Sequence, residues 1–245
     1  MIAICEDLSE IREMEARMRQ ADRLATVGRM AANIAHEIRN PLASMTGAIE
    51  ALAGPVPGSD ERDRLTQIVS RESDRLNRII RDFLAYARPA PLTLEAVNVA
   101  EILDEVLVLI EHRELPSSLK IVREFPAVVT GRVDPQQVRQ AVWNLCLNAV
   151  EAMPDGGELR VSAGLEDHRL YIVIRDTGDG IPSSDQPHVF EPFFSTKPGG
   201  SGLGLALVHR IVRDHGGDVS VRSSNGGGTS AVVVLPAAVD TAVTR

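Results

Sequence analysis

The chain has 245 residues, enough for one large domain or two small ones, and its apolar content of 44% is ordinary for a globular protein. Only 3% of the residues are aromatic and the formal net charge is −8, which argues against a nucleic-acid partner, because such surfaces cluster cations and stacking rings. Cys5 and Cys146 lack any CxxC partner, so neither a zinc site nor a disulfide framework is indicated.

The first half of the chain predicts a helical hairpin. Apolar residues recur at steps of three and four over residues 24–52, which predicts a helix over 9–53. The proline- and glycine-containing loop 54–60 breaks it, and a second apolar stripe over 65–83 predicts another helix that ends before Pro89. Two stripes rarely enclose a dry core, so we predict that two antiparallel hairpins pair as a homodimeric four-helix bundle.

The second half predicts an α/β domain with helices covering one face of a mixed sheet. The expected strands are residues 120–124, 158–163, 170–175, 218–223 and 230–235. The expected helices are residues 99–112, 135–153 and 203–215, the second of which has Asp134 as its N-cap and Pro135 in its first turn. Residues 225–229 are expected to join the last two strands as a hairpin turn.

His36 is the first candidate for chemistry. Ile34 and Ile38 belong to the apolar stripe, and a residue two positions from each lies about 200° round the helix, so the imidazole is expected to face solvent. A lone surface histidine more often has no role. Here a neutral imidazole could attack a γ-phosphoryl group while the carboxylate of Glu37 removes or orients its other proton, and Asn40 lies one turn later.

Asn144 and Asn148 lie one turn apart on the same helix face. A carboxamide oxygen suits Mg²⁺ that carries triphosphate oxygens, although such a pair can also decorate a surface helix. Asp176 ends an expected strand, where a carboxylate can accept a hydrogen bond from the amine of adenine. Gly178 and Gly180 would let the backbone approach the ring, but alone this pattern could be a turn.

A glycine-rich segment precedes the last expected helix, where free N–H groups and the helix dipole favour phosphate. Its spacing fits neither a Walker A loop nor a Rossmann fingerprint. The candidate phosphate-binding residues there are Gly200, Gly202, Leu203 and Gly204. Residues 185–199 hold three of the five phenylalanines and are interpreted as a lid, with Lys197 available for phosphate; an ordinary ordered loop is the alternative.

In combination and order, these segments resemble the catalytic core of sensor histidine kinases of two-component systems, over residues 24–236. Residues 35–42 resemble the H-box, 144–149 the N-box, 176–180 the G1 box, 190–194 the F-box and 200–204 the G2 box. The resemblance implies the Bergerat ATP-binding fold of the GHKL ATPases for the second domain. It also implies that His36 is phosphorylated from ATP, with Asn148 on Mg²⁺, Asp176 on adenine and Asn144 orienting metal and phosphate.

The resemblance further implies how the chain is divided. The expected parts are a signalling or linker helix over 1–20, a dimerisation and histidine phosphotransfer domain over 21–88, a linker over 89–96, an ATP-binding domain over 97–236 and a tail over 237–245. No apolar run approaches the roughly 18 residues of a membrane span. We therefore expect a cytoplasmic chain without direct membrane contact, whose full-length protein can be anchored through an upstream region.

By the same resemblance, the partner is a response-regulator receiver domain whose aspartate takes the phosphoryl group. A residue at the position of Asn40 can orient water for the reverse, phosphatase reaction. Residues 22–32 and 191–197 look most like the nitrogen- and pilus-regulation branch.

Two other classes stay open. A GHKL-type ATPase with a hydrolytic cycle, such as gyrase, typically has a glutamate where Asn144 stands and lacks an H-box hairpin. A dimeric scaffold that binds ATP and signals by shape would leave the pair His36 and Glu37 unexplained.

Overall fold

The computed structural model describes residues 34–54, 58–87, 91–113, 115–197, 200–224 and 226–237. The chain divides into two compact units, residues 1–89 and 90–245. The expected linker helix over 1–20, the first part of the predicted helix over 9–53 and nearly all of the expected tail lie outside the described residues.

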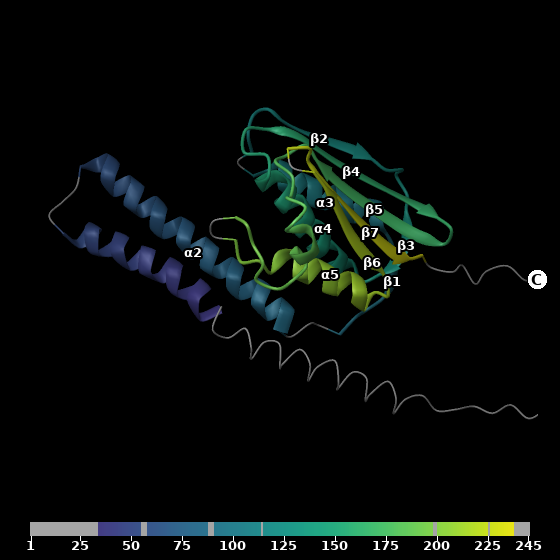
Figure 1. Ribbon diagram of the computed structural model, residues 1–245, viewed down its shortest axis with the longest axis horizontal. Helices are drawn as coiled ribbons and strands as arrows, with labels where there is room; N and C mark the ends of the chain where they lie inside the picture. Colours follow the sequence, from purple (N-terminus) through teal and green to yellow (C-terminus); the bar gives the residue numbers. More distant parts are fainter. Residues whose placement is uncertain are drawn as a thin grey trace, which may run out of the picture. The chain divides into compact units, whose positions relative to one another are not determined.

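The described part of the first unit contains two helices that form an antiparallel pair, as predicted (Figure 1). Residues 34–53 are helical, and α2 (Ser59–Ala87) follows. Ile34, Pro41 and Ala48 recur every seven residues and are buried on one face of the first helix. Ile79 is buried on α2, so an apolar seam holds the pair together.

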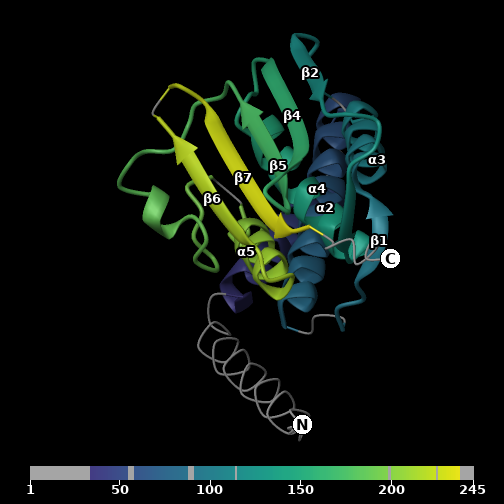
Figure 2. The same cartoon turned by 90° about the vertical axis from the view of Figure 1, so that its right-hand side faces the viewer.

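The second unit is built on a five-stranded sheet in the order β2-β4-β5-β7-β6, which Figure 2 shows side by side. Its strands are β2 (Leu119–Glu124), β4 (Gly157–Glu166), β5 (Arg169–Asp176), β6 (Asp218–Ser223) and β7 (Thr229–Pro236). Only the β2–β4 pair is parallel and the other neighbours are antiparallel, so the predicted mixed sheet is confirmed. The pairing of β6 with β7 also confirms the predicted hairpin.

Three helices cover one face of this sheet (Figure 1). They are α3 (Val99–Glu111), α4 (Pro135–Glu151) and α5 (Gly204–Asp214), with the short 3₁₀ helix η1 (Gln186–His188) before α5. Helix α4 lies between α3 and α5 and contacts both. Its start is fixed as predicted, because the Asp134 carboxylate accepts hydrogen bonds from the backbone N–H groups of Gln136 and Gln137.

Two strands were not predicted. β1 (Glu95–Asn98) and β3 (Thr130–Val133) pair only with each other, each is four residues long, and neither has a strong apolar alternation. β1 begins at Glu95, within the residues expected to form a linker. Among the helices of the described ranges, none is long and apolar enough to cross a membrane.

Candidate functional site

His36 is exposed on the first helix, and Ile34 two residues earlier is buried. The prediction that the imidazole faces away from the apolar seam is therefore confirmed for the described hairpin. Asn40, one turn further on, is also exposed. A partner molecule can thus approach both side chains from the same side of the helix.

Glu37 faces α2 and lies beside Arg75. The Arg75 Nη2 atom is 3.7 Å from Glu37 Oε2, and Arg75 Nη1 is 3.4 Å from Glu72 Oε2. Glu72 is buried, with only 8% of its surface exposed. The guanidinium therefore joins the carboxylate next to His36 to an acidic side chain of α2, a connection that the spacing of the sequence did not reveal.

In the second unit, the N-box residues Asn144 and Asn148 differ in their surroundings. Asn144 is buried; its Oδ1 accepts a hydrogen bond of 3.3 Å from Gln140 Nε2, and its Nδ2 donates one of 3.3 Å to the carbonyl of Gly204. The side chain of Asn148 is partly exposed and makes no hydrogen bond within the described ranges. Asn144 thus fixes the start of α5, while the Asn148 amide is available to a ligand.

Asp176 lies at the end of β5, as predicted, and is only 7% exposed. Its Oδ1 accepts hydrogen bonds from the backbone N–H of Gly178 at 2.9 Å and of Thr229 at 3.1 Å. Burial raises the pKa of this carboxyl above its usual value, and these two hydrogen bonds and the charge of Lys197 oppose the rise. Both backbone donors bond Oδ1, so Oδ2 is left for a ligand.

The glycines of the G1 and G2 segments permit close packing. A Cβ on Gly178 would lie 2.4 Å from the carbonyl oxygen of Ala152, which follows α4. Gly202 has a φ of +62°, and a Cβ there would lie 2.4 Å from the carbonyl carbon of Phe193. The N-box, G1, F-box and G2 segments are therefore held in contact around the C-terminal half of α4 and the start of α5.

The predicted lid is attached to α4. Lys197 Nζ donates a hydrogen bond of 3.2 Å to the carbonyl of Asn148 and lies 3.0 Å from Glu151 Oε2. A cation is favoured at this position because the last carbonyls of a helix carry partial negative charge. The ammonium thus lies beside the N-box rather than in open solvent, and the residues that follow it, Pro198 and Gly199, are outside the described ranges.

The remaining residues predicted in the G2 segment contribute in different ways. Leu203 is fully buried, so its side chain belongs to the core and only its backbone can reach a phosphate. Gly204 is the first residue of α5, and Gly200 lies near the hydroxyl of Ser195. Gly180, the remaining glycine of the G1 segment, has a backbone φ of +74°.

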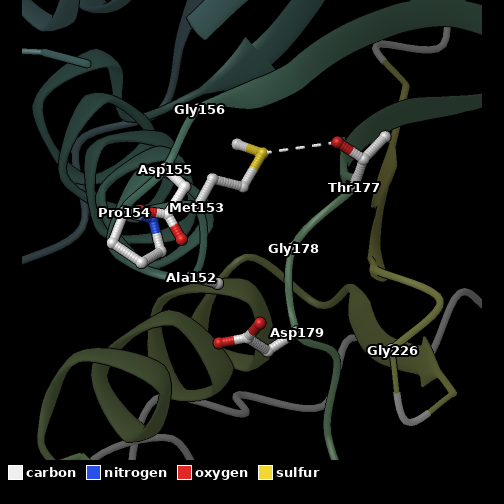
Figure 3. Close-up of a pocket in the computed structure, with 9 residues that line it drawn as sticks. All are labelled: Ala152, Met153, Pro154, Asp155, Gly156, Thr177, Gly178, Asp179 and Gly226. Carbon is white, nitrogen blue, oxygen red and sulfur yellow. Dashed lines mark hydrogen bonds between the residues drawn. The ribbon is translucent and has the colours of Figure 1, made fainter. Parts of the chain in front are cut away.

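A pocket of about 190 Å³ adjoins the G1 segment. It is lined by residues 152–156, which follow α4, by residues 177–179, and by Gly226 of the hairpin between β6 and β7. Figure 3 shows these side chains, with the Thr177 hydroxyl 3.7 Å from the Met153 sulfur. Of the predicted nucleotide residues, only Gly178 lines this pocket.

Sequence reasoning missed three residues that the structure connects to the site. Thr229 bonds Asp176 through its backbone, Glu151 pairs with Lys197, and Arg75 pairs with Glu37. The first is a backbone contact, which no side-chain pattern can reveal. The other two join segments that lie 46 and 38 positions apart in the chain, so local periodicity carries no information about them.

Comparisons with known proteins match both units. Residues 26–91 match the His Kinase A (phospho-acceptor) domain, and residues 133–239 match the histidine kinase-, DNA gyrase B- and HSP90-like ATPase family. The sensor histidine kinase ZraS of Escherichia coli K12 is 34% identical over 227 residues, which cover 91% of this chain and 48% of that protein. The signal transduction histidine-protein kinase AtoS of the same organism is 34% identical, over 96% of this chain and 39% of that protein.

Solved structures of histidine kinases are also similar to this chain. The histidine kinase ThkA, crystallised in complex with the response regulator protein TrrA, is 25% identical with a TM-score of 0.82, over 97% of this chain and 70% of that one. The mycobacterial sensor histidine kinase MprB is 33% identical with a TM-score of 0.54, over 59% of this chain and 98% of that one. The present chain spans about half the length of the curated relative ZraS. From its two domains and these relatives, the chain belongs to the sensor histidine kinases of two-component systems.

Proposed function

We propose that this chain is an ATP:protein-histidine phosphotransferase that phosphorylates itself on His36 and then passes the phosphoryl group to an aspartate of a response-regulator receiver domain. One observation carries the proposal: an exposed imidazole is followed directly by a carboxylate that lies beside a guanidinium, in a chain whose other unit brings the N-box, G1, F-box and G2 segments together. The choice of partner is supported by the similar kinase ThkA, which was crystallised with the response regulator protein TrrA.

Nucleotide recognition is assigned to the region around α4. The Asp176 carboxylate, with Oδ1 fixed by two backbone donors, would accept a hydrogen bond from the exocyclic amine of adenine through Oδ2. The N-terminal N–H groups of α5, preceded by Gly202, would face the phosphates. Lys197 would supply a positive charge to the same phosphates by turning from Glu151.

The residues present fit a magnesium–nucleotide complex. The Asn148 side chain offers a hard, uncharged oxygen without a competing hydrogen bond in the described part of the chain. Within that part there is also no cluster of three or more His, Cys, Asp or Glu side chains that would hold a metal by itself. A metal ion at Asn148 would therefore be shared with phosphate oxygens and water, and it would neutralise charge on the triphosphate.

The chemical step follows from the properties of an imidazole. One neutral ring nitrogen of His36 attacks the γ-phosphorus, an N–P bond forms, and the bond from phosphorus to the β–γ bridging oxygen breaks to release ADP. Glu37 accepts or orients the proton on the other ring nitrogen. Attack by the receiver aspartate then breaks the N–P bond and restores the imidazole. For the reverse activity, Asn40 would orient water towards the phosphorylated regulator.

We also assign a homodimer to the first unit. Leu42 and Ile49, seven residues apart on the first helix, and Ile80 and Leu84, four apart on α2, are exposed although all four are apolar. A hairpin that leaves such a stripe uncovered is completed when a second hairpin packs against it. The cytoplasm is the compartment we assign, because it supplies ATP and receiver domains. The nitrogen- and pilus-regulation branch stays a prediction.

The alternative function, an ATPase with a hydrolytic cycle, has less support. The position where the hydrolytic relatives typically carry a glutamate is Asn144, whose amide is buried and occupied by Gln140 and Gly204. An amide cannot remove a proton from water.

The proposal is tested by incubating the chain with γ-labelled ATP and Mg²⁺. We expect a label that is labile in acid and stable in alkali, and we expect it to move to a receiver domain when the cognate regulator is added. Asn148→Ala should abolish labelling and leave the dimer intact. An acid-stable label, or release of inorganic phosphate without a labelled protein, would refute the transferase assignment.

A further inference from the structure

The contact between Glu37 and Arg75 carries an inference that deepens the proposed function and rests on it. We propose that Arg75 of α2 is a positioning residue for the phosphotransfer step: it acts through Glu37 by holding one carboxylate oxygen and directing the other towards His36. Arg75 itself touches neither nucleotide nor imidazole in this role.

The two carboxylate oxygens of Glu37 have different surroundings. Oε2 is buried, makes no hydrogen bond, and lies 3.7 Å from Arg75 Nη2. The Glu37 side chain is nevertheless 29% exposed, so its accessible part lies away from Oε2. Since His36 is exposed on the same helix, Oε1 is the oxygen that can reach its ring when the two side chains meet.

A second acid holds the guanidinium in place. Arg75 Nη1 lies 3.4 Å from Glu72 Oε2, and Glu72 is buried three residues earlier on α2. Arg71 also contacts Glu72, at 3.5 Å, but its side chain is 74% exposed and it does not pair with Glu37. Arg75 is within ion-pair distance of both carboxylates, and the Nε atom of its own side chain is buried without a hydrogen bond.

This arrangement suits a carboxylate that must accept a proton from His36. A bidentate pair at hydrogen-bonding distance would bind both oxygens of Glu37 and oppose proton uptake. Here Arg75 Nη2 lies 3.7 Å from Glu37 Oε2, beyond hydrogen-bonding distance, while Nη1 of the same guanidinium lies 3.4 Å from Glu72 Oε2. The attraction orients the carboxylate and leaves its accessible oxygen free to accept a proton.

The alternative is that the three side chains only stabilise the hairpin. An ion pair that crosses two helices would do so, and removing its cation would leave two acids facing each other, one of them buried. The two interpretations differ in how Arg75 and Glu37 combine. A positioning residue has no effect once the group it positions is gone, whereas a stabilising residue acts regardless.

The experiment is a double-mutant cycle in the full chain, read as the single-turnover rate of labelling by γ-labelled ATP at saturating nucleotide. Arg75→Met should lower the rate about tenfold, the effect of misplacing a general base, and leave the KM for ATP unchanged. In a Glu37→Gln background, Arg75→Met should cause no further loss. Arg75→Lys should recover part of the rate, and Arg71→Met, which contacts the same Glu72, should match the parent.

Folding is controlled with Glu72→Gln, which removes the buried acid that Arg75→Met would leave unpaired. The Glu72→Gln/Arg75→Met protein should be dimeric and still slow. The proposal is overturned if this folded variant labels at the rate of Glu72→Gln alone, or if the losses from Glu37→Gln and Arg75→Met multiply. A parent protein that does not label at all would refute the proposed function first, an outcome distinct from either of these.

Discussion

The backbone N–H of Phe193 donates a 2.9 Å hydrogen bond to the carbonyl of Gly202. This bond closes the F-box against the G2 segment, and it requires the two backbones to approach more closely than a side chain on Gly202 would allow. The F-box and the G2 segment are therefore joined directly through their backbones.

Gly202→Ala should weaken nucleotide binding more than it weakens folding. The new Cβ would meet the Phe193 backbone at 2.4 Å, so the two segments must separate. Gly226→Ala is the matched control: its φ of +69° is similar, but nothing lies within 4 Å of a Cβ there. Both variants should lose about 1 kcal/mol from the left-handed backbone. Calorimetric titration with a non-hydrolysable ATP analogue should show a lower affinity for Gly202→Ala alone; equal affinities would contradict the account.

Lys197→Met should weaken ATP binding about tenfold, the size of one charge-assisted hydrogen bond, with a smaller effect on adenosine. The reason is that the ammonium would face phosphate and not the base. Lys120→Met is the control, since Lys120 also pairs with a glutamate, Glu158, but on β2 and β4. The measurement is competition of ATP, ADP and adenosine for a fluorescent nucleotide. A loss that is the same for all three would show that Lys197 does not act on phosphate.

The strongly patterned parts of this fold could be predicted from the sequence. Residues 218–223 form β6 as predicted, and Asp134 caps α4 as its position before Pro135 indicated. Such features depend on local periodicity and on backbone chemistry, which neighbouring residues determine. β1 and β3 could not be found, because four-residue strands that pair only with each other have no long pattern.

Asp176→Asn should lower the affinity for ATP on the order of 100-fold and lower it less for GTP. An amide nitrogen in place of Oδ2 can donate to the guanine carbonyl but repels the adenine amine. The check is a comparison of ATP and GTP affinities in both proteins. An unchanged preference for ATP would mean that Asp176 does not recognise the adenine base.

The same residue predicts a pH dependence. Burial raises the pKa of Asp176, so acidification protonates it at a higher pH than an ordinary aspartate and removes an acceptor for adenine. Nucleotide affinity should therefore fall as the pH falls through that raised pKa. The contribution of Asp176 to folding stability depends on pH in the opposite direction, because the folded state binds the proton more tightly than the unfolded state. This stabilisation is full at low pH and is lost as the pH rises through the raised pKa. Measurements of nucleotide affinity against pH should differ between the parent and Asp176→Asn in this range.

Ile49→Asp should break the dimer. Ile49 is 52% exposed on the hairpin, where a second hairpin would cover it, and a buried carboxylate there would be unpaired. Leu165→Asp is the control, because Leu165 is similarly exposed, at 54%, but lies on β4. Sedimentation velocity should give a monomer for the first variant and a dimer for the second. A dimer in both cases would place the subunit contact elsewhere.

The candidate site shows where sequence reasoning stops. The exposure of His36 and the strand-end position of Asp176 could be predicted from the helix period and the strand boundary. The hydrogen-bond partner of Asn144 could not be predicted, because Gly204 lies 60 residues away in the chain and is reached only when α4 packs on α5. Pairs formed by packing depend on the whole fold, and a single sequence does not contain their distances.

We propose above that the imidazole of His36 receives the γ-phosphoryl group of ATP. Its most direct measurement is mass spectrometry of the chain after incubation with ATP and Mg²⁺, with digestion at alkaline pH so that a phosphoimidazole survives. We expect one phosphoryl group on the peptide that contains His36, and none after His36→Gln. A phosphoryl group on another residue, with His36 unmodified, would contradict it.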